Sequence, residues 1–140
     1  MENRDINNEI LLLSFSEILL LLQSLGYTSV RGIRMDIKKA GDGQVVQMIS
    51  RLVNRGLLIP EEGRFQIEEH LGYMLICMGE PEYTYETEYD GELFYCYERK
   101  DKALVTSIYQ RREDVLELRL FTADELKVWK EEMQDAAGRY

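Results

Sequence analysis

The sequence predicts an α+β fold with a mainly helical N-terminal part, a four-stranded antiparallel sheet and a C-terminal helix. Three observations carry this prediction. Apolar residues follow the helical period in the first half, the period becomes two between Glu82 and Phe121, and two capping patterns mark helix starts. A chain of 140 residues can bury a core without disulfides or metals. We therefore expect one domain over residues 1–140.

The first elements are a strand and a helix. Ile10 to Leu13 is a short apolar run that fits a buried strand. Ser14 to Glu17 matches a capping box, in which the serine hydroxyl accepts from an early helical N–H and the glutamate reaches back. A helix from Phe15 to Leu25 follows, and Gly26 ends it. Its Leu19 to Leu22 run is apolar nearly all round, which indicates burial on more than one side.

Two more helices are expected in the N-terminal part, residues 10–78. Thr28 to Ala40 shows no clear pattern, whereas Gln44 to Arg55 has helical periodicity. Another helix is expected from about Glu68 to Met78. The apolar stripe predicted for the Gln44 to Arg55 helix consists of Val45, Val46, Ile49, Leu52 and Val53.

Leu52 to Leu71 has the pattern of a winged helix. A helix closes at Gly56, a short apolar strand follows, Pro60 to Gly63 makes a turn, and a second strand returns. In a winged helix, the helix before this hairpin lies in the major groove of DNA and the turn approaches the phosphates.

The sheet is expected between residues 82 and 121. Tyrosines alternate with polar residues up to Tyr89, and Asp90-Gly91 supplies a hairpin turn. Lys100 to Lys102 and Arg111 to Asp114 supply the next two turns, so the four strands form a meander. A second capping box, Thr122 to Glu125, opens the C-terminal helix over residues 122–137.

The charge of the chain limits its partners. The formal net charge is -9, from 17 basic and 26 acidic residues, so the average field repels phosphate backbones and anionic lipids. The charge is uneven, because Arg31 to Arg55 holds six basic and two acidic residues, whereas Glu61 to Glu92 holds one basic and ten acidic residues. Binding to nucleic acid is therefore not the first expectation, although a local basic face remains open.

The expected location is the cytoplasm. Cys77 and Cys96 lie in apolar or aromatic surroundings without ligand spacing, as packed thiols do in a reducing compartment. The start MENRDINNE is polar and mixed in charge, which is not typical of a signal peptide. Polar residues interrupt Ile10 to Leu25, so no membrane insertion is expected.

No catalytic pattern is visible. The single histidine, His70, lacks a second histidine or cysteine at ligand spacing, and we expect a residue on a helix surface. The sequence has no phosphate loop, dinucleotide glycine pattern or nucleophile elbow. The acidic run Glu80 to Glu92 alternates with tyrosines, as on a solvated sheet face. We therefore expect no enzyme, no cofactor and no metal site.

The tyrosines of two neighbouring strands are the candidate binding residues. Tyrosine combines broad apolar contact with a polar tip, which is enriched in protein–protein interfaces. Core packing explains such a cluster about as often. Because strand residues alternate, Tyr83, Tyr85 and Tyr89 are expected to be either all core or all interface. The candidate partner-binding residues are Tyr83, Tyr85, Tyr89, Phe94, Tyr95 and Tyr97.

A DNA-binding regulator is the alternative. The turn of the presumed wing carries Glu61 and Glu62, which have the wrong sign for phosphate. The residues that would contact DNA are Lys38, Lys39, Gln47, Arg51, Asn54 and Arg55.

The order of these elements resembles the EspG-type chaperones of type VII (ESX) secretion systems. The matching stretches are ILLLSFSEILLLLQSLG at Ile10 to Gly26, RLVNRGLLIPEEGRFQI at Arg51 to Ile67, and the sheet from Glu82 onward. They are patterned rather than invariant motifs. The family is roughly twice as long and has two related halves, so the resemblance covers about one half. Thr122 to Ala137 resembles the opening of a second half.

The resemblance implies a cytosolic adaptor without catalytic activity. Family members hold a secreted helical hairpin by its hydrophobic tip and help deliver it to the export machinery. The protein partner expected here is such a helical secreted substrate. Because only one half is present, the resemblance also suggests that a homodimer replaces the missing half.

Overall fold

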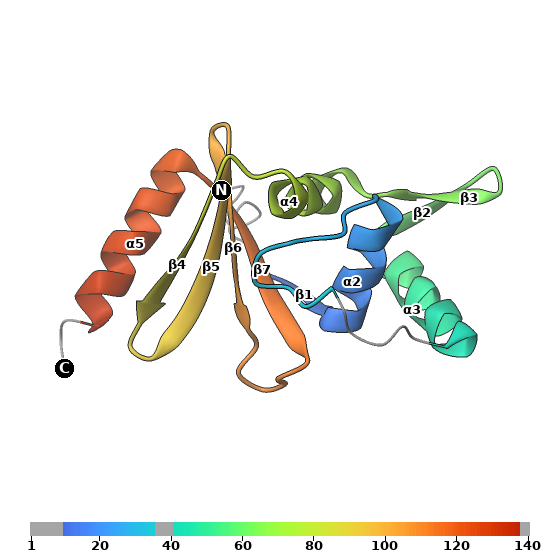
Figure 1. Cartoon of the computed structure of the whole chain (residues 1–140), viewed down its shortest axis with the longest axis horizontal. Coiled ribbons are helices and arrows are strands. Elements are labelled where there is room, and N and C mark those ends of the chain that lie inside the picture. The colour runs from blue at the N-terminus through green and yellow to red at the C-terminus, as the bar shows by residue number, and fades with distance from the viewer. Residues whose placement is uncertain (1–9, 36–40, 138–140) are drawn as a thin grey trace.

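The computed structural model describes residues 10–35 and 41–137. An antiparallel sheet separates one long helix, α5, from the helices α2 and α4 (Figure 1). The helix α3 and a small hairpin lie beyond α2 and α4 on the side away from the sheet. The fold is therefore of the mixed α+β class that the sequence predicts.

The main sheet has five strands in the order β1-β7-β6-β5-β4. The expectation of four strands is wrong, because β1 (Leu11–Ser14) joins the sheet by pairing antiparallel with β7 (Val115–Thr122). Hairpin turns identify only strands that are neighbours in sequence, whereas β1 and β7 are far apart along the chain. The remaining strands are β4 (Tyr83–Tyr89), β5 (Glu92–Arg99) and β6 (Lys102–Ile108).

Two of the hairpins have two-residue turns in which both φ angles are positive. Asp90 and Gly91 between β4 and β5 have φ angles of 53° and 83°, the left-handed pair that a type I′ turn needs. Glu62 and Gly63 have φ angles of 44° and 83° and join β2 (Leu58–Glu61) to β3 (Arg64–Ile67). Pro60 remains in β2, so the turn is shorter than the four residues that the sequence suggests.

The larger core lies between the sheet and the helices α2 (Phe15–Ser24) and α4 (Glu69–Gly79). The capping box of α2 is present as predicted, because the Ser14 N–H donates to Glu17 over 2.9 Å and the Glu17 N–H donates to the Ser14 hydroxyl over 3.0 Å. Fully buried side chains of this core include Ile18, Leu22, Leu71, Met74, Leu75, Leu104 and Leu118.

Helix α3 (Asp42–Asn54) reaches this core through the buried Leu52, and the partly buried Ile49 and Val53 pack against it. Val46 is 66% exposed, so its expected place in the apolar stripe is wrong. At 100° per residue Val46 lies at the margin of the stripe, where α2 and the hairpin do not cover it. The β2–β3 hairpin follows α3 and projects away from the body of the molecule (Figure 1).

Helix α5 (Ala123–Ala137) covers the opposite face of the sheet through a second, aromatic core. Its capping box is also present, since the Thr122 N–H donates to Glu125 over 2.8 Å. Trp129 lies in the centre of this core, with ring centroids 5.1 Å from Phe94 and 5.7 Å from Phe121.

Candidate functional site

Two of the six candidate binding residues belong to the core under α5. Tyr89 and Phe94 are 9% and 4% exposed, and both contact the Trp129 ring at an edge-to-face angle. They therefore stabilise the packing of α5 on the sheet. The structure places them away from any open surface of the described chain.

Tyr97 lies in the other core, with 1% of its surface exposed. Its hydroxyl donates a 2.6 Å hydrogen bond to the backbone carbonyl of Arg31, and burial raises the pKa of this phenol. The expectation that Tyr97 acts as an exposed contact is therefore wrong. The side chain instead holds the segment around Arg31 against the sheet.

The expectation that Tyr83, Tyr85 and Tyr89 share one environment is also wrong. Tyr83 is 69% exposed, Tyr85 is half-buried and Tyr89 is buried. Alternation does put all three on the α5 side of the sheet, but Trp129 covers only the Tyr89 end of β4. The alternation along β4 thus determines which face of the sheet a tyrosine occupies. The position of α5 determines whether that tyrosine is buried.

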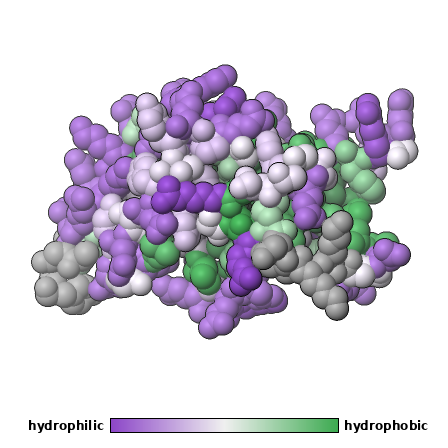
Figure 2. Space-filling model, in the orientation of Figure 1, coloured by the Kyte–Doolittle hydropathy of each residue, from purple (hydrophilic) through white to green (hydrophobic). Residues whose placement is uncertain are grey.

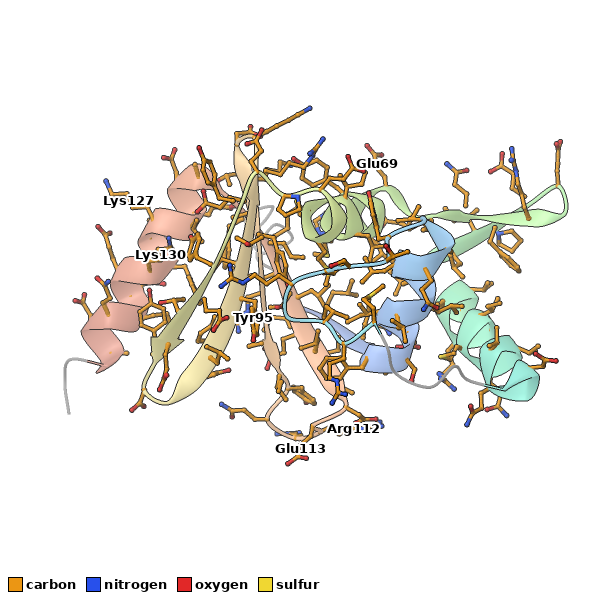
Figure 3. All side chains as sticks on the ribbon, viewed as in Figure 1. Glu69, Tyr95, Arg112, Glu113, Lys127 and Lys130 are labelled. Atoms are coloured by element: carbon orange, nitrogen blue, oxygen red, sulfur yellow. The ribbon has the colours of Figure 1, made fainter. Side chains whose placement is uncertain are left out.

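Tyr85 is held between α5 and β5. Its hydroxyl donates to Glu98 over 2.6 Å and accepts from Lys130, whose ammonium lies 4.5 Å from the centroid of the tyrosine ring. Burial, followed by the hydrogen bond with Glu98, raises the pKa of Tyr85. Figure 3 shows Lys130 on the side of α5 that faces the strands. These contacts make Tyr85 a link within the fold.

Tyr95 is the candidate residue that borders an open pocket. The pocket has a volume of about 350 Å³ and lies on the α2 side of the sheet. Figure 3 places Tyr95 near the middle of the molecule, on the strand next to the edge strand β4. The lining of the pocket is mainly apolar and includes Phe15, Gly32, Leu93, Tyr95, Ile108 and Leu116.

The mouth of this pocket exposes aliphatic side chains. Leu93 on β5 is 43% exposed and Ile108 on β6 is 53% exposed, whereas Leu116 at the back is 5% exposed. Figure 2 shows hydrophobic surface among hydrophilic side chains near the lower ends of these strands. The pocket therefore combines a buried apolar wall with an accessible apolar rim.

A tight turn builds one wall of the pocket. The Ile33 N–H donates to the Val30 carbonyl over 3.1 Å, and Gly32 between them has a φ angle of 83°. A Cβ atom on Gly32 would lie 2.9 Å from Cδ1 of Tyr95, so the glycine backbone rests directly on the tyrosine ring. Tyr97 holds the same turn through Arg31. Both tyrosines thus fix the shape of the pocket.

Acidic side chains border the pocket on the β4 side. In the β4–β5 register Glu86 lies opposite Tyr95 and Glu88 lies opposite Leu93. Residues opposite each other in an antiparallel pair point to the same face, so both carboxylates stand beside the apolar lining. Glu86 lies 3.4 Å from Arg31 in an ion pair whose side chains are about half exposed. Arg34 borders the pocket on the side of the turn.

The residues proposed for DNA contact are only partly available. Arg51 lies 3.7 Å from the buried carboxylate of Glu17, and Arg55 donates a 2.8 Å hydrogen bond to the Leu12 carbonyl of β1. Gln47 and Asn54 are exposed on the outer side of α3. Lys38 and Lys39 lie outside the described residues.

The remaining candidates for chemistry are few. His70 is exposed at the start of α4, as the sequence suggests. Cys77 and Cys96 are buried free thiols, and burial raises the pKa of each to about 11. Within residues 10–35 and 41–137, no three histidine, cysteine or acidic side chains are grouped to hold a metal ion. In the same part of the chain, no helix has the length and apolar character to cross a membrane.

Sequence reasoning identified Tyr95 but missed the rest of the pocket. Phe15 appeared only as the start of a helix, and Gly32 lay in a segment without a clear pattern. Leu93 and Ile108 belong to strands whose alternation does not say which end remains open. They come together because β5 and β6 are neighbours in the sheet.

Comparison with known proteins adds no family to this geometry. No family model matches the chain, and no curated protein matches it.

Proposed function

We propose that the protein is a non-enzymatic binding module whose pocket receives an apolar side chain of a protein partner. The observation that carries the proposal is the pair Leu93 and Ile108, 43% and 53% exposed at the mouth of a 350 Å³ apolar pocket. Removing such surface from water contributes about 25 cal/mol per Å². A well-packed apolar anchor in a pocket is also the usual centre of a protein interface.

The proposed partner is a helical secreted protein, and the proposed role is that of a cytoplasmic chaperone or adaptor. The support for this role is the sequence resemblance to EspG-type chaperones, together with the acidic composition and an apolar pocket that suits a helix tip. An amphipathic helix offers apolar residues at positions three and four apart, which can enter one pocket together.

Affinity capture with pocket variants tests the proposal. The bait proteins are the wild type, a Leu93→Ser/Ile108→Ser variant, and a Val128→Ser control. Val128 is 52% exposed on α5, so its replacement removes exposed apolar surface away from the pocket. We expect a small helical secreted protein to bind the wild type and the control and to be lost from the pocket variant.

Two results would contradict the proposal. One is a partner that binds the pocket variant as well as it binds the wild type. The other is the absence of a reproducible partner in cells that express the chain at its natural level. Circular dichroism and thermal melting of each bait exclude unfolding as the cause.

The alternative function is a winged-helix regulator that binds DNA. A helix, α3, followed by the projecting β2–β3 hairpin favours this alternative. However, Arg51 and Arg55 have contacts within the fold. Gln47 and Asn54 are exposed, so a Gln47→Ala/Asn54→Ala variant tests base contact without disturbing the fold. Saturable, sequence-selective binding in a low-salt gel shift that this variant loses would favour DNA binding.

A further inference from the structure

We propose that the pocket selects a partner segment in which a basic side chain stands one helical turn from the apolar anchor. This inference rests on the proposed function and adds the chemistry of the partner. It follows from the position of two carboxylates, Glu86 and Glu88, relative to the pocket.

The β4–β5 register places an acid beside each of the two β5 residues that line the pocket. Glu88 lies opposite Leu93 and Glu86 lies opposite Tyr95, on the same face of the sheet. Side chains opposite each other in such a pair have Cβ atoms about 5 Å apart. Along this edge of the pocket, an acidic side chain therefore stands beside an apolar one at two positions.

The two carboxylates differ in their existing partners. Glu86 is in an ion pair with Arg31, which also donates to the Thr84 side chain over 3.2 Å. Glu88 is exposed, and no basic side chain among the described residues lies in ion-pair distance of it. A basic group from a partner would therefore meet Glu88 without displacing an ion pair among the described residues.

The spacing matches a helix. Residues three or four apart on a helix have Cβ atoms about 5–6 Å apart, close to the separation of Leu93 and Glu88. A helix with an apolar residue in the pocket thus places a lysine or arginine at the third or fourth position beside Glu88. The net charge of -9 adds long-range attraction for such a basic segment.

A carboxylate on an edge strand has another common role, which is to prevent pairing with other strands. That role needs only a charge on β4, and it predicts no preference for a basic residue in a bound helix. The two roles differ in what a selection experiment returns.

The experiment is a selection from a phage-displayed library of helical peptides with randomised surface positions. The targets are the wild type, Glu88→Lys, Leu93→Ser and Glu132→Lys. Glu132 is exposed on α5, on the other face of the sheet, so its reversal changes the net charge equally without changing the pocket edge. Glu88 is exposed, and circular dichroism checks that each target is folded.

On the wild type and Glu132→Lys we expect peptides with a large apolar residue and a lysine or arginine three or four positions away. On Glu88→Lys the apolar anchor should remain, while the basic residue is lost or replaced by an acidic one. The basic peptides should bind Glu88→Lys roughly fivefold more weakly than the wild type, as expected for an exposed charge pair. Leu93→Ser should return no shared anchor.

The outcomes separate this inference from the proposed function. Apolar anchors without a basic preference, or a basic preference that Glu88→Lys keeps, would overturn the charge selection and leave the binding pocket standing. If no peptide is enriched on the wild type, or if Leu93→Ser enriches the same peptides, the pocket is not a binding site and both proposals fail.

Discussion

Neighbouring tyrosines of β5 differ in what their hydroxyl groups and rings contact. The Tyr97 hydroxyl donates to the Arg31 carbonyl, whereas the Tyr95 ring supports Gly32 and borders the pocket. Both contacts hold the turn from Val30 to Ile33, which lies between α2 and α3 in the sequence. The shape of the pocket thus depends on contacts within the fold, and these contacts should be tested through stability.

Two substitutions separate the ring of Tyr97 from its hydroxyl. Tyr97→Phe removes one hydrogen bond and should lower the free energy of unfolding by about 1 kcal/mol. Tyr97→Ala removes a fully buried aromatic side chain and should lower it by about 3–5 kcal/mol. Urea titration monitored by circular dichroism measures both values. A Tyr97→Ala loss below about 1 kcal/mol would show that the ring is not part of the core.

The contact between Gly32 and Tyr95 can be tested against a matched glycine. Gly32 and Gly63 both have a φ angle of 83°, but a Cβ atom meets other atoms only at Gly32. Gly63→Ala should cost about 1–2 kcal/mol from the left-handed backbone alone. Gly32→Ala should cost more, because the new methyl group displaces the Tyr95 ring. Equal losses in urea unfolding would show that the ring moves aside freely.

At the scale of elements, local signals in the sequence are confirmed and long-range pairing is not predicted. Both capping boxes form, because each depends on residues three apart in one segment. The Asp90-Gly91 turn forms for the same reason. The pairing of β1 with β7 depends on how the whole chain closes, and no short pattern indicates it.

The two capping boxes share one pattern, a hydroxyl residue followed by a glutamate three positions later, in different surroundings. Glu17 is 5% exposed and lies near Arg51, whereas Glu125 is half-buried. Glu17→Ala leaves a partly buried Ser14 N–H without its acceptor and should cost about 1–3 kcal/mol. Glu125→Ala should cost about 0.5–1 kcal/mol, as at an accessible helix end. Thermal unfolding of the two variants shows which of them loses more stability. A larger loss of stability for Glu125→Ala would contradict the prediction.

At the scale of the whole molecule, the pocket is assembled from segments that are far apart in sequence. Phe15 begins a helix and Gly32 lies in a turn. Leu93 lies near the start of β5, and Ile108 is the last residue of β6. Sequence periodicity assigns a face to each of these residues, but the open part of that face depends on where the neighbouring helices end. This is why the sequence predicted a tyrosine-rich surface and the structure instead shows an aliphatic pocket with Tyr95 at its edge.

Packing of the whole chain also bears on self-association. A homodimer would also be favoured if one chain could not bury the apolar Leu19 to Leu22 run. The structure buries Leu19, Leu21 and Leu22 within one chain, so this run no longer supports a dimer. Exposed Leu93 and Ile108 remain as apolar surface. Sedimentation at micromolar concentration tests the homodimer, which stays a prediction.

The buried phenols and thiols should make the fold sensitive to alkaline pH. The pKa of Tyr27 is raised to about 12 by burial and then by its hydrogen bond with Glu80, and the pKa values of Cys77 and Cys96 are raised to about 11 by burial. A raised pKa means that the folded state holds its proton more tightly than the unfolded state. This stabilisation is complete below the unfolded pKa values, near 9 for the thiols and 10 for the phenol, and it is lost as pH rises toward 11 and 12.

We therefore expect the free energy of unfolding in urea to be nearly level from pH 7 to 8.5 and to fall steeply between pH 9 and 12. The slope reflects the proton that the unfolded chain releases first, and each buried thiol contributes at most about 1.4 kcal/mol per pH unit between its unfolded and folded pKa values. Cys96→Ala removes one such group, so it should lower stability at pH 8 through the lost packing and flatten the decline between pH 9 and 11. Cys96 is fully buried, so its ionisation is coupled to unfolding. An unchanged slope in that variant would mean that the Cys96 thiol ionises as easily in the folded protein as in the unfolded chain.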